Sequence, residues 1–154
     1  MINIIRTDSS NSDFIALIGL LDKYLQIKNG DDDSFFAQFN KIDKIQHVVV
    51  AYSNNIPVGC GAIKKYSDNV TEVKRMFVLN EFRGKGIATA VLNELEAWAQ
   101  ELGFSDLILE TGNTFYEAIG LYQKKGYKVI PNYGQYEGVE FSVCMQKNIK
   151  QEVK

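Results

Sequence analysis

The stretch VTEVKRMFVLNEFRGKGIATAVLNELEAWAQELGF, residues 70–104, decides the fold, because it joins a predicted strand to a predicted helix through a glycine-rich basic loop. Residues 70–78 are rich in β-branched and apolar side chains, which favour a strand. After Gly86 an apolar stripe recurs at helical spacing, opposite a polar face; it consists of Ile87, Val91, Leu95, Trp98 and Leu102. Gly103 then predicts the end of this helix.

Further elements extend outward from this unit on both sides. Upstream, the sequence predicts a strand over 2–5, a helix over 14–25 capped by Asp8-Ser9-Ser10 and ended by Asn29-Gly30, a shorter helix over 31–39, and a hairpin of strands 48–52 and 56–65. Downstream, it predicts a strand over 107–109, a helix that a capping box at Thr114–Glu117 opens and that reaches Lys125, and strands over 127–130 and 141–145. This order predicts an α/β fold in which helices cover a mixed sheet.

Composition limits the classes of protein. A chain of 154 residues favours a single domain, and a formal charge of −2 argues against a broad nucleic-acid-binding surface. The longest apolar-plus-glycine run, 14–21, is too short to cross a membrane, and the first residues lack the features of a signal peptide, so a cytoplasmic location is expected. Cys60 and Cys144 are expected to be buried, reduced thiols, and His47 a strand-end residue. No metal site is predicted.

The loop Arg83–Thr89 carries the chemistry. Two cations precede the positive end of a helix dipole, which is unfavourable unless an anion is present, and the glycines let backbone N–H groups approach that anion. Lys85 is followed by Gly86 rather than Ser or Thr, which excludes a Walker loop, and Thr89 replaces the third glycine of a dinucleotide-binding fingerprint. A glycine turn with exposed basic residues is the alternative interpretation.

Two motifs in this order resemble those of one enzyme family. Arg83-x-x-Gly86-x-Ala88, following Met76-Phe77-Val78, resembles motif A of the GNAT superfamily of N-acetyltransferases, which binds the pyrophosphate of acetyl-CoA. The segment 118–127 resembles that superfamily's motif B, and the resemblance covers roughly 48–147. It implies a mixed, mostly antiparallel central sheet with helices on both faces, and a single acetyltransferase domain over 1–154 with a loose tail at 150–154.

The resemblance also implies how acetyl-CoA is bound. The backbone of Met76 to Val78 would pair with the pantetheine arm like an added strand, and the N–H group of Val78 would bind the thioester carbonyl. The implied cofactor-binding residues are Met76, Phe77, Val78, Arg83, Gly84, Lys85, Gly86, Ile87, Ala88 and Thr89. The family often places an asparagine at the position of Phe115, and Asn113, two residues earlier, is left without an assigned role.

Two residues are candidates for proton transfer. Glu72 falls where some GNAT proteins carry a general base, although a water molecule can serve instead, and Tyr122 occupies the position of the general acid that protonates the departing thiolate. A half-buried core tyrosine is the alternative for Tyr122. The two-residue period of a strand predicts that Glu72, Lys74, Met76 and Val78 share one face.

The acceptor is expected to be the primary amine of a small molecule that attacks acetyl-CoA directly in a ternary complex. Lys74, Tyr133 and Tyr136 are its candidate binding residues, and Lys74 either binds an acceptor carboxylate or merely neutralises Glu72. A peptide N-acetyltransferase and a non-catalytic coenzyme A-binding module are the alternatives. No metal, nucleic acid or membrane is expected as a partner, and a homodimer is considered because many relatives are dimers.

Overall fold

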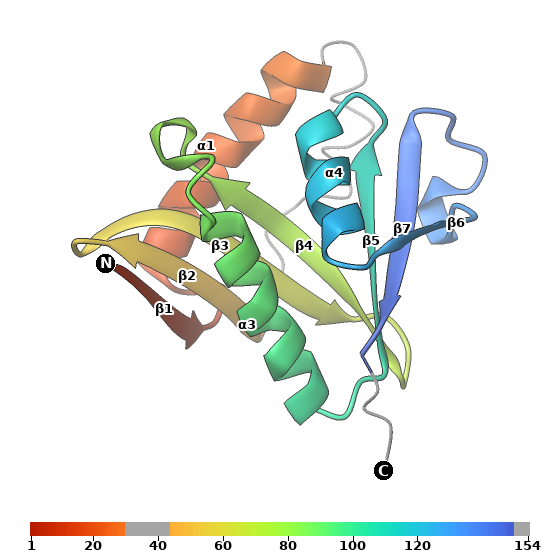
Figure 1. The fold of residues 1–154 in the computed structure, drawn as a ribbon, viewed down its shortest axis with the longest axis horizontal. Coiled ribbons are helices and arrows are strands. Elements are labelled where there is room, and N and C mark those ends of the chain that lie inside the picture. The colour runs from red at the N-terminus through yellow and green to blue at the C-terminus, as the bar shows by residue number, and fades with distance from the viewer. Residues whose placement is uncertain (30–43, 150–154) are drawn as a thin grey trace. The chain divides into compact units, whose positions relative to one another are not determined.

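The structure is a computed structural model that describes residues 1–29 and 44–149. Its strands form a seven-stranded sheet in the order β1-β2-β3-β4-β5-β7-β6 (Figure 1). The elements are β1 (Ile2–Thr7), α1 (Ser12–Asn29), β2 (His47–Ser53), β3 (Ile56–Lys65), β4 (Val70–Val78), the 3₁₀ helix η2 (Asn80–Phe82), α3 (Ile87–Glu101), β5 (Asp106–Gly112), α4 (Tyr116–Lys124), β6 (Lys128–Ile130), the 3₁₀ helix η3 (Gly134–Tyr136) and β7 (Ser142–Asn148). The helix expected over 31–39 and the tail expected over 150–154 lie outside the described residues.

The chain divides into two compact units. The first comprises Met1–Lys64 and Lys74–Leu95, and the second comprises Lys65–Val73 and Glu96–Lys154. β4 and α3 each begin in one unit and end in the other, so each unit contains part of a strand and part of a helix that continue into its counterpart.

Antiparallel strands build the sheet of the first unit. β1 pairs with β2 and β2 with β3, and the β2–β3 hairpin closes with Ser53 opposite Ile56. Asn54 and Asn55 between them have φ angles of 50° and 68°. Positive φ at both central residues defines a type I′ turn, whose twist matches that of the flanking strands, and asparagine tolerates this conformation better than most residues. The predicted hairpin is confirmed.

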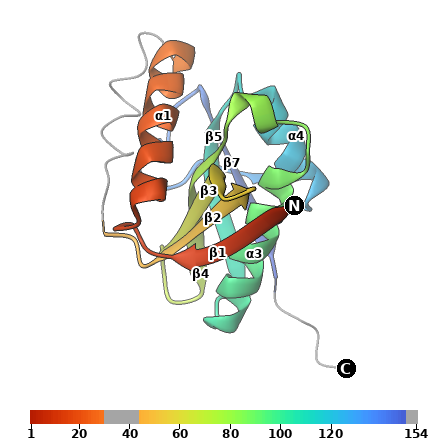
Figure 2. The same ribbon diagram turned by 90° about the vertical axis from the view of Figure 1, so that its left-hand side faces the viewer.

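Helices cover both faces of this sheet (Figure 2). One face packs against α1 in a buried cluster formed by Phe14, Leu17, Ile18, Leu21, Ile45, Val48, Val50, Cys60, Ala62 and Phe77. On the other face, glycine lets α3 approach β3 closely: a Cβ on Gly61 would lie 2.9 Å from Leu95 Cδ1 and 3.0 Å from Val91 Cγ1. Along β3, Cys60 and Ala62 face α1, whereas Gly59 and Gly61 face α3. The two helices therefore lie on opposite faces of the sheet, and the prediction of helices on both faces is confirmed.

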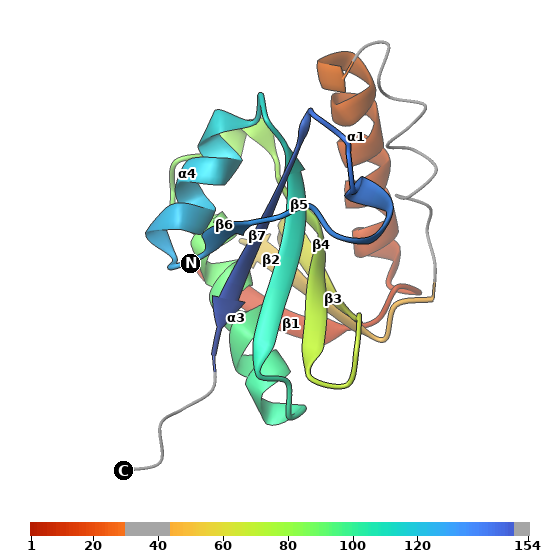
Figure 3. The same cartoon turned by 90° about the vertical axis from the view of Figure 1, so that its right-hand side faces the viewer.

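The second unit contains the parallel pair of the sheet (Figure 3). β4 and β5 run parallel, with residues Val70 to Glu72 opposite Asp106 to Ile108. β5 pairs with β7 along its whole length, from Asp106 to Gly112, and β7 pairs with β6; both of these pairings are antiparallel. The sheet is therefore mixed and mostly antiparallel, as predicted.

Two helix starts differ from the prediction. α1 is capped by Asn11, whose Oδ1 accepts a hydrogen bond from the backbone N–H of Phe14 at 2.9 Å, whereas Asp8 accepts one from the backbone of Ser10. At α4 the N-cap residue is Phe115, with no side-chain capping bond, so the predicted capping box at Thr114–Glu117 is wrong. At α1, several neighbouring residues have side chains able to cap, so the pattern did not single out Asn11; α4 begins without any side-chain cap, so the capping pattern misplaced its start.

Two expectations from composition can be compared with the structure. Cys60 and Cys144 are free and buried, as expected. Within residues 1–29 and 44–149, no helix is long and apolar enough to span a bilayer.

Candidate active site

The loop between η2 and α3 presents backbone groups to solvent. Gly84 and Gly86 have φ angles of 77° and 80°, a region in which side chains are strained, and both residues are exposed along with Lys85. The first hydrogen bond of the helix runs from the N–H of Ala90 to the carbonyl of Gly86 at 3.0 Å. The N–H groups that precede it have no partner within the helix, and the first turn contains no acidic side chain. This geometry suits a bound anion.

Arg83 is held at the start of this loop. Its Nε donates to the carbonyl of Val78 at 3.3 Å, and its guanidinium lies 4.9 Å from the centroid of the Tyr24 ring on α1. Lys85 Nζ lies 5.2 Å from the centroid of the Phe82 ring. The sequence analysis missed Tyr24, because it lies on the exposed side of α1 and carries no local signal.

The strand that leads to the loop is irregular at Arg75, whose φ of 60° is left-handed. Beyond it, Phe77 packs into the cluster below α1, whereas the sulfur of Met76 lies on the α3 side, within 2.5 Å of the position a Cβ on Gly61 would take. A left-handed residue can interrupt the two-residue period of an extended strand. Arg75 and Phe77 both face α1 and Met76 faces α3, however, so alternation is kept from Arg75 to Phe77, and the shared face of Glu72, Lys74, Met76 and Val78 stays a prediction.

Glu72 is a buried carboxylate in the second unit. Its side chain accepts a hydrogen bond from the hydroxyl of Tyr133 at 2.6 Å, across 61 residues of sequence. The Tyr133 ring is packed edge-on between those of Tyr66 and Tyr136, with centroid distances of 5.3 and 5.7 Å. Burial, followed by the Glu72 charge and this hydrogen bond, raises the pKa of Tyr133 well above its usual range. Tyr133 thus stays protonated and donates to Glu72.

Tyr122 is buried in α4 of the same unit. Its ring meets that of Tyr127 edge-on at 5.7 Å between centroids. Burial, and after it the charge of Glu110, raises the pKa of Tyr122 above its usual range, so the phenol holds its proton firmly. Glu110 in turn accepts a hydrogen bond from Ser142 Oγ at 2.7 Å. The charge of Glu110 near Tyr122 has no signal in the sequence, because β5 and α4 are separate elements and only the folded chain brings the two side chains together.

The other predicted site residues are distributed over both units. Lys74 is half-exposed on β4, and Tyr136 is buried in η3 beside Tyr133. Asn113 is exposed, and its backbone N–H donates to the carbonyl of Phe141 at 2.8 Å. Among residues 1–29 and 44–149, no group of three or more acidic, histidine or cysteine side chains is arranged to hold a metal ion. The first unit thus contains the predicted anion-binding loop, and the second contains Glu72 and Tyr122.

Comparison with known proteins gives consistent matches. The model of the Acetyltransferase (GNAT) family matches residues 15–127. The IAA acetyltransferase of Azospirillum brasilense is 34% identical over 141 residues, covering 86% of this chain and 88% of that protein. A Klebsiella pneumoniae structure assigned as an acyl-CoA N-acyltransferase is 30% identical with a TM-score of 0.80, covering 96% of this chain and 97% of its own.

A more distant structure was solved with acetyl-CoA bound. This GNAT family acetyltransferase from Elizabethkingia anophelis has a TM-score of 0.67 at 17% identity, over 96% of this chain and 98% of its own. At that identity the similarity shows a shared fold. The matched residues 15–127 include the loop before α3, Glu72 and Tyr122.

Proposed function

The chain belongs to the GNAT family of acetyltransferases and is therefore an acetyl-CoA-dependent N-acyltransferase, and we propose that it acetylates the primary amine of a small molecule by direct attack in a ternary complex. The observation that carries this proposal is the buried Glu72 carboxylate, held by a phenol that keeps its proton. A buried, oriented carboxylate is suited to remove a proton from an ammonium group or from a water molecule beside it.

Acetyl-CoA binds, in this proposal, through the loop before α3. The pyrophosphate lies against the N–H groups of Gly84 to Thr89, with charge supplied by Arg83 and Lys85. The pantetheine arm runs along the backbone of Met76 to Val78, and the N–H of Val78 donates to the thioester carbonyl. The exposed, left-handed glycines of the loop and the acid-free first turn of α3 support this assignment.

Proton transfer then completes the reaction. Glu72, directly or through water, accepts the proton of the acceptor ammonium, and the neutral nitrogen attacks the thioester carbon. The C–N bond forms, the C–S bond breaks, and the thiolate leaves. Tyr122, whose raised pKa keeps the phenol protonated at neutral pH, donates its proton to the departing sulfur. The phenolate takes the second proton from the acylated nitrogen, which leaves a neutral amide, and Glu72 returns its proton to solvent. The acetylated amine and coenzyme A are the products.

A small-molecule acceptor is favoured by the relative from Azospirillum brasilense, whose name refers to IAA as its substrate. Acceptor-dependent release of coenzyme A from acetyl-CoA tests the proposal, with pools of small amines and pools of peptides assayed separately. Turnover with small amines is expected. Turnover with peptides alone would identify a peptide N-acetyltransferase, and acetyl-CoA binding with no turnover in any pool would identify a non-catalytic coenzyme A-binding protein.

The candidate residues can be tested in the same assay. Glu72→Gln keeps the size and hydrogen bonding of the side chain but removes its basicity, and it is expected to lower kcat by roughly 10²- to 10⁴-fold, the usual contribution of a positioned base. An unchanged kcat would assign the proton transfer to water.

A further inference from the structure

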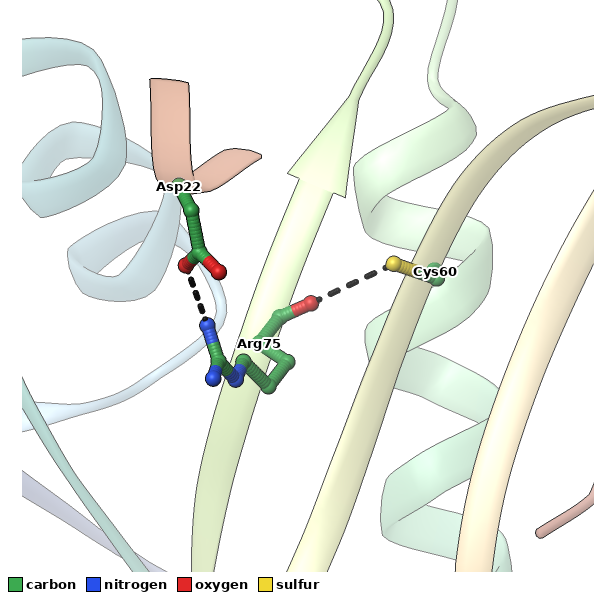
Figure 4. Close-up of polar contacts among 3 residues, drawn as sticks. All are labelled: Asp22, Cys60 and Arg75. Carbon is green, nitrogen blue, oxygen red and sulfur yellow. Dashed lines mark hydrogen bonds and ion pairs between the residues drawn. The ribbon is translucent and has the colours of Figure 1, made fainter. Parts of the chain in front are cut away.

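Arg75 is a buried cation within β4. Its side chain is only 2% exposed, and Nη1 forms an ion pair with Oδ1 of Asp22 on α1 at 2.7 Å (Figure 4). Asp22 itself is 49% exposed, so the ion pair leads from the buried guanidinium to the protein surface. The thiol of Cys60 donates to the backbone carbonyl of Arg75 at 3.4 Å, which anchors the peptide on the opposite side (Figure 4).

The second terminal nitrogen of this guanidinium is not used. Nη2 is buried, and no atom of the part of the chain that the structure describes accepts a hydrogen bond from it. Leaving a buried charged donor without an acceptor is more unfavourable than leaving a neutral donor in the same position. Proteins seldom retain such a group unless another component satisfies it.

The backbone at the same residue is strained. A φ of 60° is uncommon for arginine and is energetically unfavourable. Strained residues of this kind persist where surrounding contacts hold them, here the bonds to Asp22 and Cys60, and they are concentrated at functional sites. The unusual conformation and the unused donor are independent observations at one residue.

We propose that Arg75 binds a carboxylate of the acceptor through Nη2, so that the acceptor is an amine that also bears a carboxylate. This inference rests on the proposed function. Arginine binds carboxylates through planar, charge-assisted hydrogen bonds, and Asp22 has already taken one nitrogen of the fork. The remaining donor suits one singly charged group.

The carboxylate is assigned to the acceptor because of the face on which Arg75 lies. The guanidinium bonds to α1, whereas α3, whose N-terminus follows the anion-binding loop, packs on the other face of the sheet. Arg83 of that loop also reaches α1, at Tyr24, but residues two apart on a helix do not face each other, so Asp22 and Tyr24 contact their arginines on different sides of α1. Arg75 is therefore separate from the predicted pyrophosphate site within the first unit. It replaces Lys74, the neighbouring cation on β4, as our candidate for carboxylate recognition.

Matched pairs of acceptors test the proposal. β-Alanine and β-alaninamide, and phenylalanine and its amide, are compared by their kcat/KM with acetyl-CoA for the wild type and for Arg75→Met, Arg75→Lys and Lys74→Met. For each variant, kcat/KM for the acid is divided by kcat/KM for the amide, and this quotient is divided by that of the wild type. The result does not depend on differences in basicity between the two amines. Arg75→Met is expected to lower this ratio by roughly 10- to 100-fold, the loss of one charge-assisted hydrogen bond.

Asp22→Asn is the matched variant with the opposite expectation. It removes the competing carboxylate from the guanidinium, so acids should gain relative to amides. A thermal shift with coenzyme A present and either β-alanine or its amide gives a readout that does not need turnover. The acid should raise the Tm of the wild type and of Asp22→Asn, but not of Arg75→Lys, which remains informative if Arg75→Met fails to fold.

The outcomes separate this inference from the proposed function. If amines are acetylated but Arg75→Met loses equal kcat/KM for acids and for amides, the inference alone is overturned. A fall in the acid-to-amide ratio in Lys74→Met, with no fall in Arg75→Met, would overturn it too. Absence of acetylation for every amine would contradict the proposed function. An equal thermal shift by acid and amide in the wild type would then overturn the inference as well.

Discussion

The hydroxyl of Tyr133 donates a hydrogen bond to Glu72 at 2.6 Å and so contributes to the orientation of its carboxylate. Tyr133→Phe keeps the ring between Tyr66 and Tyr136 and removes only this hydrogen bond. We expect kcat to fall by about 10- to 100-fold, the equivalent of one hydrogen bond to a charged group, with KM for acetyl-CoA unchanged. Steady-state kinetics with both substrates varied measures this split.

Tyr66→Phe is the control, because it removes a phenol from the same aromatic cluster without touching the Tyr133–Glu72 bond. It should retain the wild-type kcat. Equal losses in the two variants would show that the cluster acts through packing, and an unchanged kcat in Tyr133→Phe would remove Tyr133 from the mechanism.

The raised pKa of Tyr122 has a consequence for the pH dependence of the reaction. An ordinary tyrosine with a pKa of 10.0 would lose its proton at the alkaline end of the assay range, but burial and the Glu110 charge keep this phenol protonated there. Tyr122→Phe should lower kcat toward the smaller end of the roughly 10²- to 10⁴-fold range of a general acid. The ratio of wild-type to variant kcat should stay constant from about pH 7 to pH 10.

Cofactor binding should be retained in Tyr122→Phe, as judged by the KM for acetyl-CoA. A variant that turns over at the wild-type rate would show that Tyr122 only packs against Tyr127. A ratio that falls to about half its neutral value as the pH reaches 10 would show that the phenol ionises in that range and has an ordinary pKa.

At the scale of elements, substitutions in the loop between η2 and α3 can distinguish the effect of backbone conformation on acetyl-CoA binding from the effect of charge. Gly86 has a φ of 80°, and a Cβ there would contact nothing within 4 Å, so any substitution strains the backbone without a clash. Asparagine tolerates this conformation and has the shape of aspartate. Gly86→Asp should therefore raise the KM for acetyl-CoA at least tenfold more than Gly86→Asn, because only aspartate repels the pyrophosphate.

Arg83→Ala should raise the KM for acetyl-CoA about tenfold, because it removes a positive charge from the loop between η2 and α3. Unchanged acetyl-CoA affinity in Arg83→Ala, together with equal effects of Gly86→Asp and Gly86→Asn, would refute the pyrophosphate assignment. Isothermal titration with coenzyme A in place of acetyl-CoA measures the affinities without turnover.

At the scale of the whole molecule, the reactivity of the two thiols reports on the unfolding of the two compact units. Cys60 lies in the first unit and Cys144 in the second, and both are fully buried. Burial raises the pKa of Cys60 to about 12 and that of Cys144 above its usual value, so neither forms the reactive thiolate in the folded protein. Alkylation at pH 8 therefore requires unfolding.

We expect the chain to unfold as one cooperative domain, because β4 and α3 run through both units and neither unit retains complete elements without the other. Pulsed alkylation across a urea gradient, followed by peptide mapping, should modify Cys60 and Cys144 with the same midpoint. Modification of one thiol at a lower urea concentration would show that its unit unfolds separately, and would contradict the single domain predicted over 1–154.

The sequence by itself determined what depends on neighbouring residues. The nine-residue strand β4, with its bounds Val70–Val78, follows from a segment rich in β-branched and apolar side chains. The asparagines of the β2–β3 turn, the left-handed glycines before α3 and the C-terminal Gly103 of that helix each record a local backbone conformation that few other residues adopt. The family was predictable for the same reason, since its motifs are short and continuous, whereas anion binding by the loop before α3 stays a prediction.

Only the tertiary structure decided which side chains meet. Tyr133 reaches Glu72 across 61 residues, and Asp22 reaches Arg75 across 53, distances over which no periodicity carries information. The left-handed Arg75 lies in a run that reads locally as a regular strand, because contacts from α1 and β3 hold a conformation that its own sequence does not favour. Elements are thus specified by local propensity, whereas the burial, pairing and proton affinity of the functional groups depend on the packing of distant segments.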